Sequence, residues 1–164
     1  MLSTSLGTKK IAFYLCGMFE KLRFPQIAID ISEEDEKYFF FDPLRKKRLV
    51  MTPEEWVRQH VIQYFLSLSY PKGLISMESG LKYNRLMKRT DIVVRDREGG
   101  VFMLVECKAA YVKVNTKTVE QASIYNQELK AKYLAVTNGN VWYCFLMDYD
   151  KQQYHQMKEF PAFG

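Results

Sequence analysis

Short runs of apolar residues, each bounded by residues typical of turns, dominate this chain. Residues 26–31 (QIAIDI) and 37–42 (KYFFFD) predict two short strands, with the acidic segment SEEDE between them as a loop. Similar runs predict further strands at residues 74–81, 91–95, 101–108, 132–137 and 141–147. Asn138-Gly139, before the last of these, is the dipeptide most typical of a tight hairpin turn. Residues 148–164 are expected to be irregular or weakly helical.

Two segments carry the apolar period of a helix. Thr52 is the expected N-cap of the first, because Pro53 follows it and Glu55 stands three residues later. That helix is expected to cover residues 53–68, with its apolar residues on one face: Val57, Val61, Phe65 and Leu68. The second is expected to open at Thr118 and to run to about residue 130.

The order of these elements is strands, helix, hairpin, helix and two more strands. Because they do not alternate regularly, as they would in a doubly wound fold, they predict an α/β (α+β) fold with a mixed β-sheet flanked by helices. The 164 residues, 48% of them hydrophobic, suffice for one core but not for two substantial domains. We therefore expect a single domain at residues 24–164 behind an N-terminal extension at residues 1–23, with Met18 as an alternative start.

The cysteines and the apolar segments indicate in which cellular compartment the protein is expected, namely the cytoplasm. The three cysteines, Cys16, Cys107 and Cys144, are odd in number and widely spaced, which is typical of reduced thiols in a cytoplasmic protein. The apolar run at residues 11–16 is short and no small-residue cleavage site follows it, so secretion is not expected. No run approaches the roughly 20 apolar residues of a membrane span, so no membrane partner is expected.

Positive charge is concentrated in two blocks. The net charge is +5, from 24 lysines and arginines against 19 acidic residues. The blocks are Arg45, Lys46, Lys47 and Arg48, and then Lys82, Arg85, Lys88 and Arg89. Such blocks neutralise phosphates, although a basic run is by default a solvated surface, and charge alone favours nucleic acid only slightly. The aromatic run at residues 38–41 offers bases a stacking surface, but it is more typical of a strand core.

Three charged residues stand at one end of the predicted hairpin. If residues 97–100 form its loop, Asp91 lies opposite Glu106 with Cβ atoms about 4.5–5.5 Å apart. Lys108 shares their sheet face, whereas Cys107 points into the core. Two carboxylates this close repel each other unless a cation lies between them, and a hard ion such as Mg²⁺ suits oxygen ligands. Lys108 would then orient or deprotonate the attacking water, or stabilise charge developing on a phosphate.

An ordinary ion pair at a strand end explains Glu106 and Lys108 equally well. An acidic residue two positions before a lysine occurs three times, at Asp35, Glu106 and Glu128, so the pattern alone has little weight. The middle copy differs because it ends an apolar strand and has Asp91 opposite. That pairing depends on the register, since a slip of one residue would move Asp91 to the other face.

Asp91, followed about fifteen residues later by Glu106-x-Lys108, resembles the PD-(D/E)XK nuclease superfamily. The segment LKYNRLMKRTDIVVRDREGGVFMLVECKAA is similar to the nuclease-like N-terminal domain of type I restriction enzyme R subunits. FDPLRKKRLVMTPEEWVRQH and YLAVTNG extend the resemblance to roughly residues 37–147. It implies a restriction-endonuclease-like mixed sheet flanked by helices and cleavage of DNA phosphodiesters with Mg²⁺ (or Mn²⁺). It also implies metal ligands at Asp91 and Glu106 and a catalytic lysine at Lys108.

The same family carries a glutamate on its first core helix and a glutamine followed four residues later by a tyrosine. For the glutamate we expect Glu54, which lies on the apolar face of the helix, because a capping box already explains Glu55. Gln121 and Tyr125 match the second pattern and share a helical face, where they would contact the site or DNA. A cap opened by Thr118 explains Gln121 equally well, and core packing is the commoner role of such a tyrosine.

These residues lead to a Mg²⁺-dependent DNA endonuclease-like domain as the first hypothesis. The expected metal ligands are Glu54, Asp91 and Glu106, and the expected catalytic residues are Asp91, Glu106, Lys108 and Gln121. Both basic blocks and Tyr125 are expected to bind DNA. Ala110 stands where proline commonly follows in the family, a departure that leaves the expected ligands untouched.

The absence of one motif from the sequence bears on the partners that the chain would need. No G-x-x-x-x-G-K-[ST] occurs in it, so the ATP-driven motor of R subunits is not expected here. The chain is expected to act alone, to depend on a separate motor or restriction-system subunit, or to form a homodimer. The alternative hypothesis is a non-catalytic DNA-binding or assembly module with the same fold.

Overall fold

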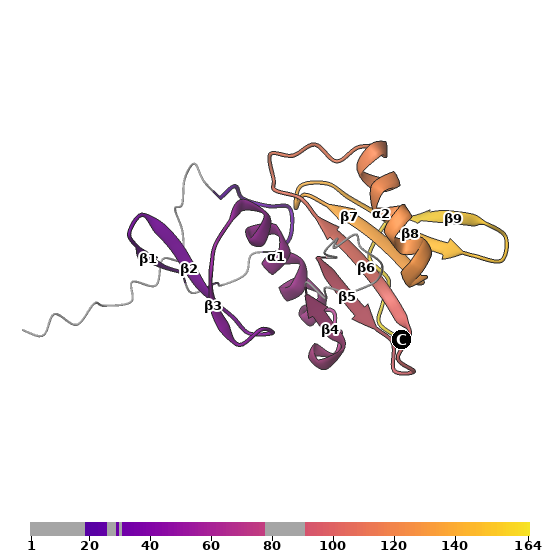
Figure 1. Cartoon of the computed structure of the whole chain (residues 1–164), viewed down its shortest axis with the longest axis horizontal. Coiled ribbons are helices and arrows are strands. Elements are labelled where there is room, and N and C mark those ends of the chain that lie inside the picture. The colour runs from indigo at the N-terminus through magenta and orange to yellow at the C-terminus, as the bar shows by residue number, and fades with distance from the viewer. Residues whose placement is uncertain (1–18, 26–28, 30, 78–90) are drawn as a thin grey trace, which may run out of the picture.

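A computed structural model describes residues 19–25, 29, 31–77 and 91–164. Figure 1 shows a small sheet beside a larger one. The small sheet has the order β1-β2-β3, with strands at Ile31–Glu34, Lys37–Asp42 and Lys47–Val50. The larger sheet has the order β4-β5-β6-β7-β8-β9, with strands at Ile75–Met77, Ile92–Arg95, Val101–Cys107, Tyr133–Thr137, Trp142–Asp148 and Gln153–Met157. Because β6 and β7 are parallel and the other pairs are antiparallel, the larger sheet is mixed, as predicted.

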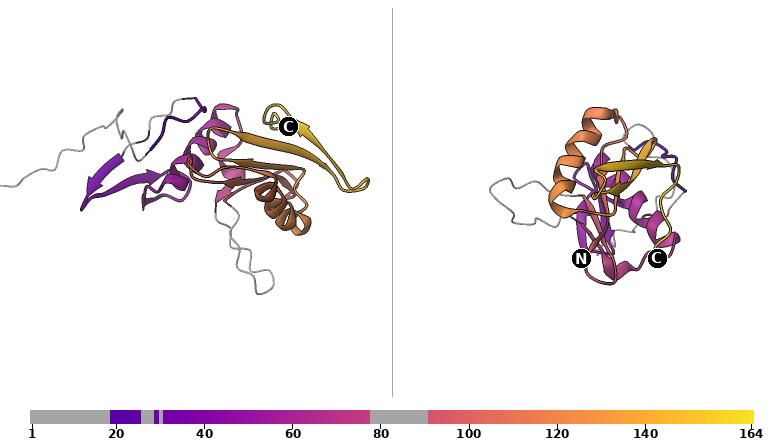
Figure 2. Two further views of the ribbon diagram at one scale, coloured as in Figure 1. Left: turned by 90° about the horizontal axis from the view of Figure 1, so that it is seen from above. Right: turned by 90° about the vertical axis from the view of Figure 1, so that its right-hand side faces the viewer.

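Two helices cover opposite faces of the larger sheet (Figure 2). Helix α1 (Pro53–Ser67) packs on the face that carries Ile92, Val94, Met103 and Val105. Helix α2 (Thr116–Leu129) packs on the other face, against Val93, Leu104, Leu134 and Val136. A 3-10 turn at Lys72–Leu74 leads into β4. Alternate strand residues therefore supply two cores, and the predicted α/β class is confirmed. Within the described part of the chain, no helix has the length and apolar character needed to cross a bilayer.

The β5–β6 hairpin has the predicted register along most of its length. Ile92 pairs with Val105, and the next two pairs follow in step. The predicted pairing departs only beside the turn, where Arg95 pairs with Val101 and the register shifts. The Asp96 side chain accepts hydrogen bonds from the backbone N–H groups of Glu98 and Gly100, at 3.1 and 2.6 Å. These bonds draw the turn tight and leave an extra residue on β6.

The small sheet departs from the sequence-based expectation in two places. Strand β1 covers the start of the acidic segment predicted as a loop, because the turn after it needs only Asp35 and Glu36, both with positive φ (48° and 60°). The earlier part of the predicted first strand, at residues 26–28 and 30, lies outside the described residues. Strand β3 follows the expected turn at Asp42, where the sequence suggested only a basic block.

The tail predicted as irregular or helical contains strand β9 instead. It pairs antiparallel with β8, and Phe160 after it is 8% exposed and joins the main core. The prediction was wrong because β9 is an edge strand whose residues, QYHQM, are almost all exposed. No apolar alternation marks such a strand in the sequence.

Residues on both sides of the expected domain boundary pack on the core. Leu22 and Phe24 belong to the main cluster, and the Arg23 backbone N–H donates to the Gly139 carbonyl at 3.0 Å. The Trp56 indole N–H donates to the Glu20 carbonyl at 2.9 Å. Residues 19–24 therefore contribute to the fold, whereas an extension ending at residue 23 stays a prediction.

Gly139 lies at the predicted turn between β7 and β8 and should not tolerate a side chain. Its φ is +84°, and a Cβ there would stand 2.7 Å from a methyl carbon of the buried Leu22. We expect Gly139→Ala to lower the free energy of unfolding by roughly 1–3 kcal/mol, because strain and a clash add together. Urea denaturation checks this against Gly73→Ala, whose Cβ meets nothing within 4 Å. An equal effect of both changes would contradict the prediction.

Candidate active site

The predicted site lies where the N-terminal end of α1 meets the ends of β5 and β6. Asp91, directly before β5, is 7% exposed. Its Oδ2 accepts a hydrogen bond of 2.6 Å from the backbone N–H of Cys107, and its Oδ1 accepts one of 2.8 Å from Nη2 of Arg58. The two bonds fix this carboxylate between β6 and α1. The Cys107 side chain is buried in the core, as predicted.

Arg58 stands among three carboxylates. Besides Asp91, it pairs through Nη2 with Oε1 of Glu54 at 2.9 Å and through Nη1 with Oε2 of Glu55. Burial by itself would lower the pKa of Arg58, but the charges of Asp91 and Glu55 outweigh it and raise the pKa above its usual value. Arg58 was not predicted as a site residue. The available signal was its spacing of three and four residues from two glutamates on one helix.

Glu106 and Lys108 form the ion pair that the strand-end interpretation expects. Lys108 Nζ lies 2.6 Å from Glu106 Oε1, and their side chains are 29% and 21% exposed. Burial and then the charge of Asp91 raise the pKa of Glu106. Burial works to lower the pKa of Lys108, yet the hydrogen bond to Glu106 and the charge of Glu106 raise it. The ion pair does not exclude a role in a site, because the charge of Asp91 raises the pKa of both Glu106 and Lys108.

Glu54 belongs to the same charge cluster. Burial and then the charge of Asp91 raise the pKa of Glu54, whereas the charges of Arg58 and Lys108 lower it. The structure therefore brings the three predicted metal ligands, Glu54, Asp91 and Glu106, and the predicted catalytic Lys108 within electrostatic reach of one another. Carboxylate oxygens are the donors that a hard divalent cation prefers. No three metal-binding side chains in the described ranges already form a ligand set, and Arg58 and Lys108 engage these carboxylates instead.

Glu55 has a separate, structural environment. Its backbone N–H donates to Thr52 Oγ1 at 3.1 Å, which confirms Thr52 as the N-cap. Its carboxylate is buried and accepts from Arg45 at 2.6 Å, from Gln59 at 2.9 Å and from Arg58. With its oxygens filled by these donors, Glu55 is not available to a ligand. The choice of Glu54 over Glu55 is consistent with this arrangement and stays a prediction.

The first basic block divides into two kinds of residue. Arg45, whose side chain is 15% exposed, pairs with Asp42 at 2.8 Å and with Glu55 at 2.6 Å, so its charge is used within the fold. Lys46, Lys47 and Arg48 are exposed. The second predicted block, Lys82, Arg85, Lys88 and Arg89, lies outside the described residues.

Helix α2 begins two residues earlier than predicted. Asn115 is the N-cap and forms a capping box with Thr118, whose backbone N–H donates to Asn115 Oδ1 at 3.2 Å. The interpretation of Gln121 as the partner of a Thr118 cap is therefore wrong, because Asn115 already supplies the cap. Gln121 is exposed and Tyr125 is half-buried on this helix, and their contact with the site or DNA stays a prediction.

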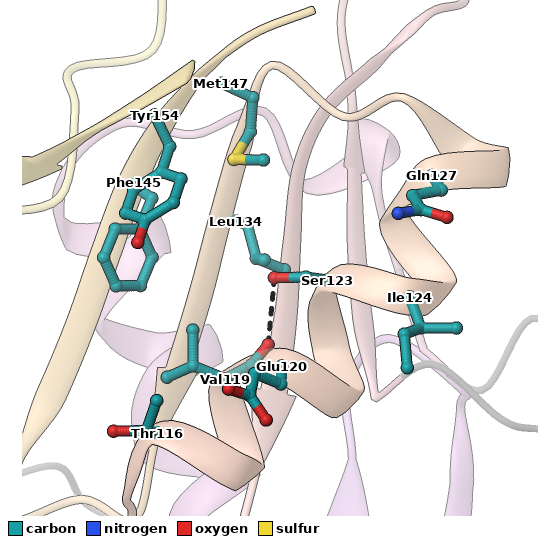
Figure 3. A pocket seen from close by; sticks show the side chains of 10 residues that line it. All are labelled: Thr116, Val119, Glu120, Ser123, Ile124, Gln127, Leu134, Phe145, Met147 and Tyr154. Atoms are coloured by element: carbon teal, nitrogen blue, oxygen red, sulfur yellow. Dashed lines mark hydrogen bonds between the residues drawn. The ribbon is translucent and has the colours of Figure 1, made fainter. Parts of the chain in front are cut away.

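A groove between α2 and strands β7–β9 is distinct from this charge cluster. Apolar side chains form most of its walls, among them Val119, Leu134 and Phe145, and Glu120 is the charged residue among them. Figure 3 shows the Ser123 hydroxyl donating to the Val119 carbonyl at 3.0 Å. This bond lies within α2, so the hydroxyl is satisfied by its own helix. Without a group of carboxylates or a lysine, this groove does not offer the chemistry expected of the site.

The chain matches known proteins over most of its length. The sequence profile of the family described as "Type I restriction enzyme R protein N terminus (HSDR_N)" matches residues 53–161. Among solved structures, a fragment described as an HsdR subunit of a type I restriction enzyme from Vibrio vulnificus YJ016 is similar, with a TM-score of 0.49 and 19% sequence identity. The match covers 66% of this chain and 23% of that one, so the chain spans about a quarter of its relative. No curated protein matches the sequence.

Proposed function

We propose, on the premise that the chain belongs to the family of type I restriction enzyme R protein N termini, that it is a Mg²⁺-dependent DNA endonuclease domain. The observation that carries the proposal is a cluster of charges: Arg58 bonds both Glu54 and Asp91, and Lys108 Nζ lies 2.6 Å from Oε1 of Glu106. Within it the charge of Asp91 raises the pKa of Glu54 and of Glu106. Carboxylates that share a partly buried place with a lysine are typical of functional sites. The substrate class is DNA, and the remaining subunits of a restriction system are the proposed partners.

Glu54, Asp91 and Glu106 would hold Mg²⁺ or Mn²⁺. The chemistry supplied by the bound ion is neutralisation of the charge that develops on the phosphate oxygens. Asp91 is held in place by Arg58 and by the backbone of β6, and Arg58 would have to move from Oδ1 of Asp91 for an ion to bind there. Glu54 is 44% exposed and is the carboxylate that can turn toward a ligand at least cost.

Lys108 is proposed to act in its charged form. Because its pKa is raised, Lys108 keeps its proton at neutral pH. It therefore suits orientation of the attacking water and stabilisation of negative charge on the phosphate better than removal of a proton. Its backbone N–H donates to the Thr137 carbonyl at 2.8 Å, which fixes the end of β6 against β7.

The DNA backbone is proposed to contact the exposed basic residues. Lys46, Lys47 and Arg48 are the exposed members of the first block, and they lie outside the buried ion pairs made by Arg45. The second block, Lys82, Arg85, Lys88 and Arg89, and the helical residues Gln121 and Tyr125 remain further candidates for this contact. Neutralising a phosphate-contacting lysine should reduce the salt dependence of DNA binding.

Cleavage of supercoiled plasmid in Mg²⁺ or Mn²⁺ tests the proposal. We expect Glu106→Gln to lower the cleavage rate by roughly 100-fold or more, because one charged ligand is lost while the shape is kept. Mn²⁺ binding, followed by electron paramagnetic resonance without DNA, should weaken in the same variant. Glu159→Gln, an exposed carboxylate in the tail, is the matched control and should change neither measurement.

Two results would contradict the proposal. Equal cleavage by wild type and Glu106→Gln would exclude Glu106 from the site. If the wild type does not cleave DNA and Mn²⁺ binds equally to the wild type and to Glu106→Gln, the non-catalytic DNA-binding or assembly module is favoured instead.

A further inference from the structure

The small sheet turns aromatic side chains away from the core. In β2 the side chains of Phe40 and Asp42 are buried, at 2% and 0% exposure, and Phe39 and Phe41 point to the opposite face because strand residues alternate. Phe41 is 61% exposed, and Val50, which pairs with Phe39 from β3, is 45% exposed. We call the face formed by Phe39, Phe41, Arg48 and Val50 the outer face. Large apolar side chains gathered on a surface in this way mark a binding site.

A guanidinium group completes the outer face. Arg48 pairs with Phe41 across the strands, and its guanidinium carbon lies 4.3 Å from the centre of the Phe39 ring. Glu34 and Ser32 of β1 accept hydrogen bonds from Arg48 at 2.8 and 2.9 Å, which hold the group over that ring. Aromatic rings and arginine planes are the surfaces on which unpaired nucleic acid bases stack. The outer face thus offers stacking surfaces fixed by a rigid sheet.

Charge around the outer face is divided between its ends. Lys46 is exposed in the β2–β3 turn, next to the outer face. Lys47 is also exposed, but it pairs with the buried Asp42 and therefore points to the opposite face. The other end, formed by the last residues of β1 and the β1–β2 turn, carries the exposed acidic residues Glu33, Glu34, Asp35 and Glu36, followed by one exposed lysine, Lys37. Phosphates are attracted to the first end and repelled by the second. A nucleic acid strand would therefore contact only a short stretch of this face, near Phe41, with its bases at the rings and a phosphate toward Lys46.

Buried ion pairs connect the small sheet to the proposed cleavage site. Asp42 at the end of β2 pairs with Arg45, Arg45 with Glu55, and Glu55 with Arg58. Arg58 in turn pairs with Asp91 at 2.8 Å. In Figure 1 the small sheet lies beyond α1, on the side away from the larger sheet. The turn that carries Lys46 is thus linked to the site through ion pairs and α1.

We propose that the outer face binds a few unpaired nucleotides of single-stranded DNA, with bases stacked on Phe41 and Arg48 and a phosphate near Lys46. The choice of DNA rests on the proposed function. Base faces are hidden inside a duplex and exposed in a single strand, so stacking selects unpaired DNA. The nuclease would then act on substrates that carry an unpaired stretch near the scissile phosphate.

Fluorescence anisotropy with a labelled oligothymidine and a duplex of equal length, both in EDTA, tests this without cleavage. We expect the wild type to bind the oligothymidine more tightly than the duplex and Phe41→Ala to weaken that binding roughly 10- to 100-fold. Phe41→Tyr should restore it, because a ring is present again. Tyr154→Ala, which removes a 66% exposed aromatic ring from β9, is the matched control and should leave it unchanged.

Failure of this proposal is distinguishable from failure of the proposed function. Glu106→Gln should bind oligothymidine as the wild type does. A wild-type chain that binds oligothymidine but does not cut DNA would overturn only the nuclease assignment. Equal affinity of wild type and Phe41→Ala, with both folded by circular dichroism, would overturn the stacking surface even if plasmid is cleaved. Equal binding of duplex and single strand by the wild type would also overturn it.

Discussion

Replacement of Arg58 by methionine is expected to lower the free energy of unfolding by roughly 3–5 kcal/mol. The Arg58 side chain is 5% exposed, and its guanidinium pairs with two buried carboxylates, those of Glu55 and Asp91. Methionine fills similar space but leaves both carboxylates without this partner in a place where water does not replace it. Because single domains are stable by only about 5–15 kcal/mol, much of the protein would unfold under mild denaturant. Urea denaturation followed by circular dichroism measures the change.

Arg48→Met is the control for that experiment. Its ion pair with Glu34 is exposed, with side-chain exposures of 46% and 60%, so its loss should cost at most about 1 kcal/mol. Arg58→Lys keeps a positive charge but not the forked donors, and it should fall between the two. If Arg58→Met unfolds at the same urea concentration as Arg48→Met, the buried ion pairs do not stabilise the junction of α1 with β5 and β6.

Lys108→Met is expected to lower the DNA cleavage rate by roughly 100- to 1000-fold, as does the loss of one group that stabilises developing charge. The pair between Lys108 and Glu106 is partly exposed, so the free energy of unfolding should change by no more than about 1 kcal/mol. Single-turnover cleavage at saturating DNA and Mg²⁺ measures the rate. Lys158→Met, which removes an exposed lysine from the tail, is the control.

Mn²⁺ binding separates the roles of Lys108 and Glu106. Loss of Lys108 frees Glu106 from its partner at 2.6 Å, so Mn²⁺ should bind to Lys108→Met at least as tightly as to the wild type. Glu106→Gln should instead lose both cleavage and Mn²⁺ affinity. Wild-type cleavage by Lys108→Met would return Lys108 to an ordinary ion pair at the end of a strand.

Residues close together in the sequence made most of the helix and strand positions of the larger sheet predictable. Thr52-Pro53 set the start of α1, Asn138-Gly139 set the turn before β8, and the apolar runs set β5, β6 and β7. The register of the β5–β6 hairpin followed from a period of two and a short turn, which was enough to place Asp91 at the end of β6 near Glu106. These features depend on residues close together in the chain, whose preferences a sequence states directly.

By itself, the sequence determined the fold class, the spacing of Asp91, Glu106 and Lys108, and the family resemblance that they carry. Tertiary structure alone decided which charges are buried. Arg58 pairs with Asp91, which lies before β5, and Arg45 pairs with Asp42 and with Glu55 of α1. Tertiary structure also decided which aromatic residues of KYFFFD face outward, since a strand that is aromatic on both faces has no readable alternation. Burial and ion pairing depend on neighbours that are distant in sequence, and only the packed chain brings these neighbours together.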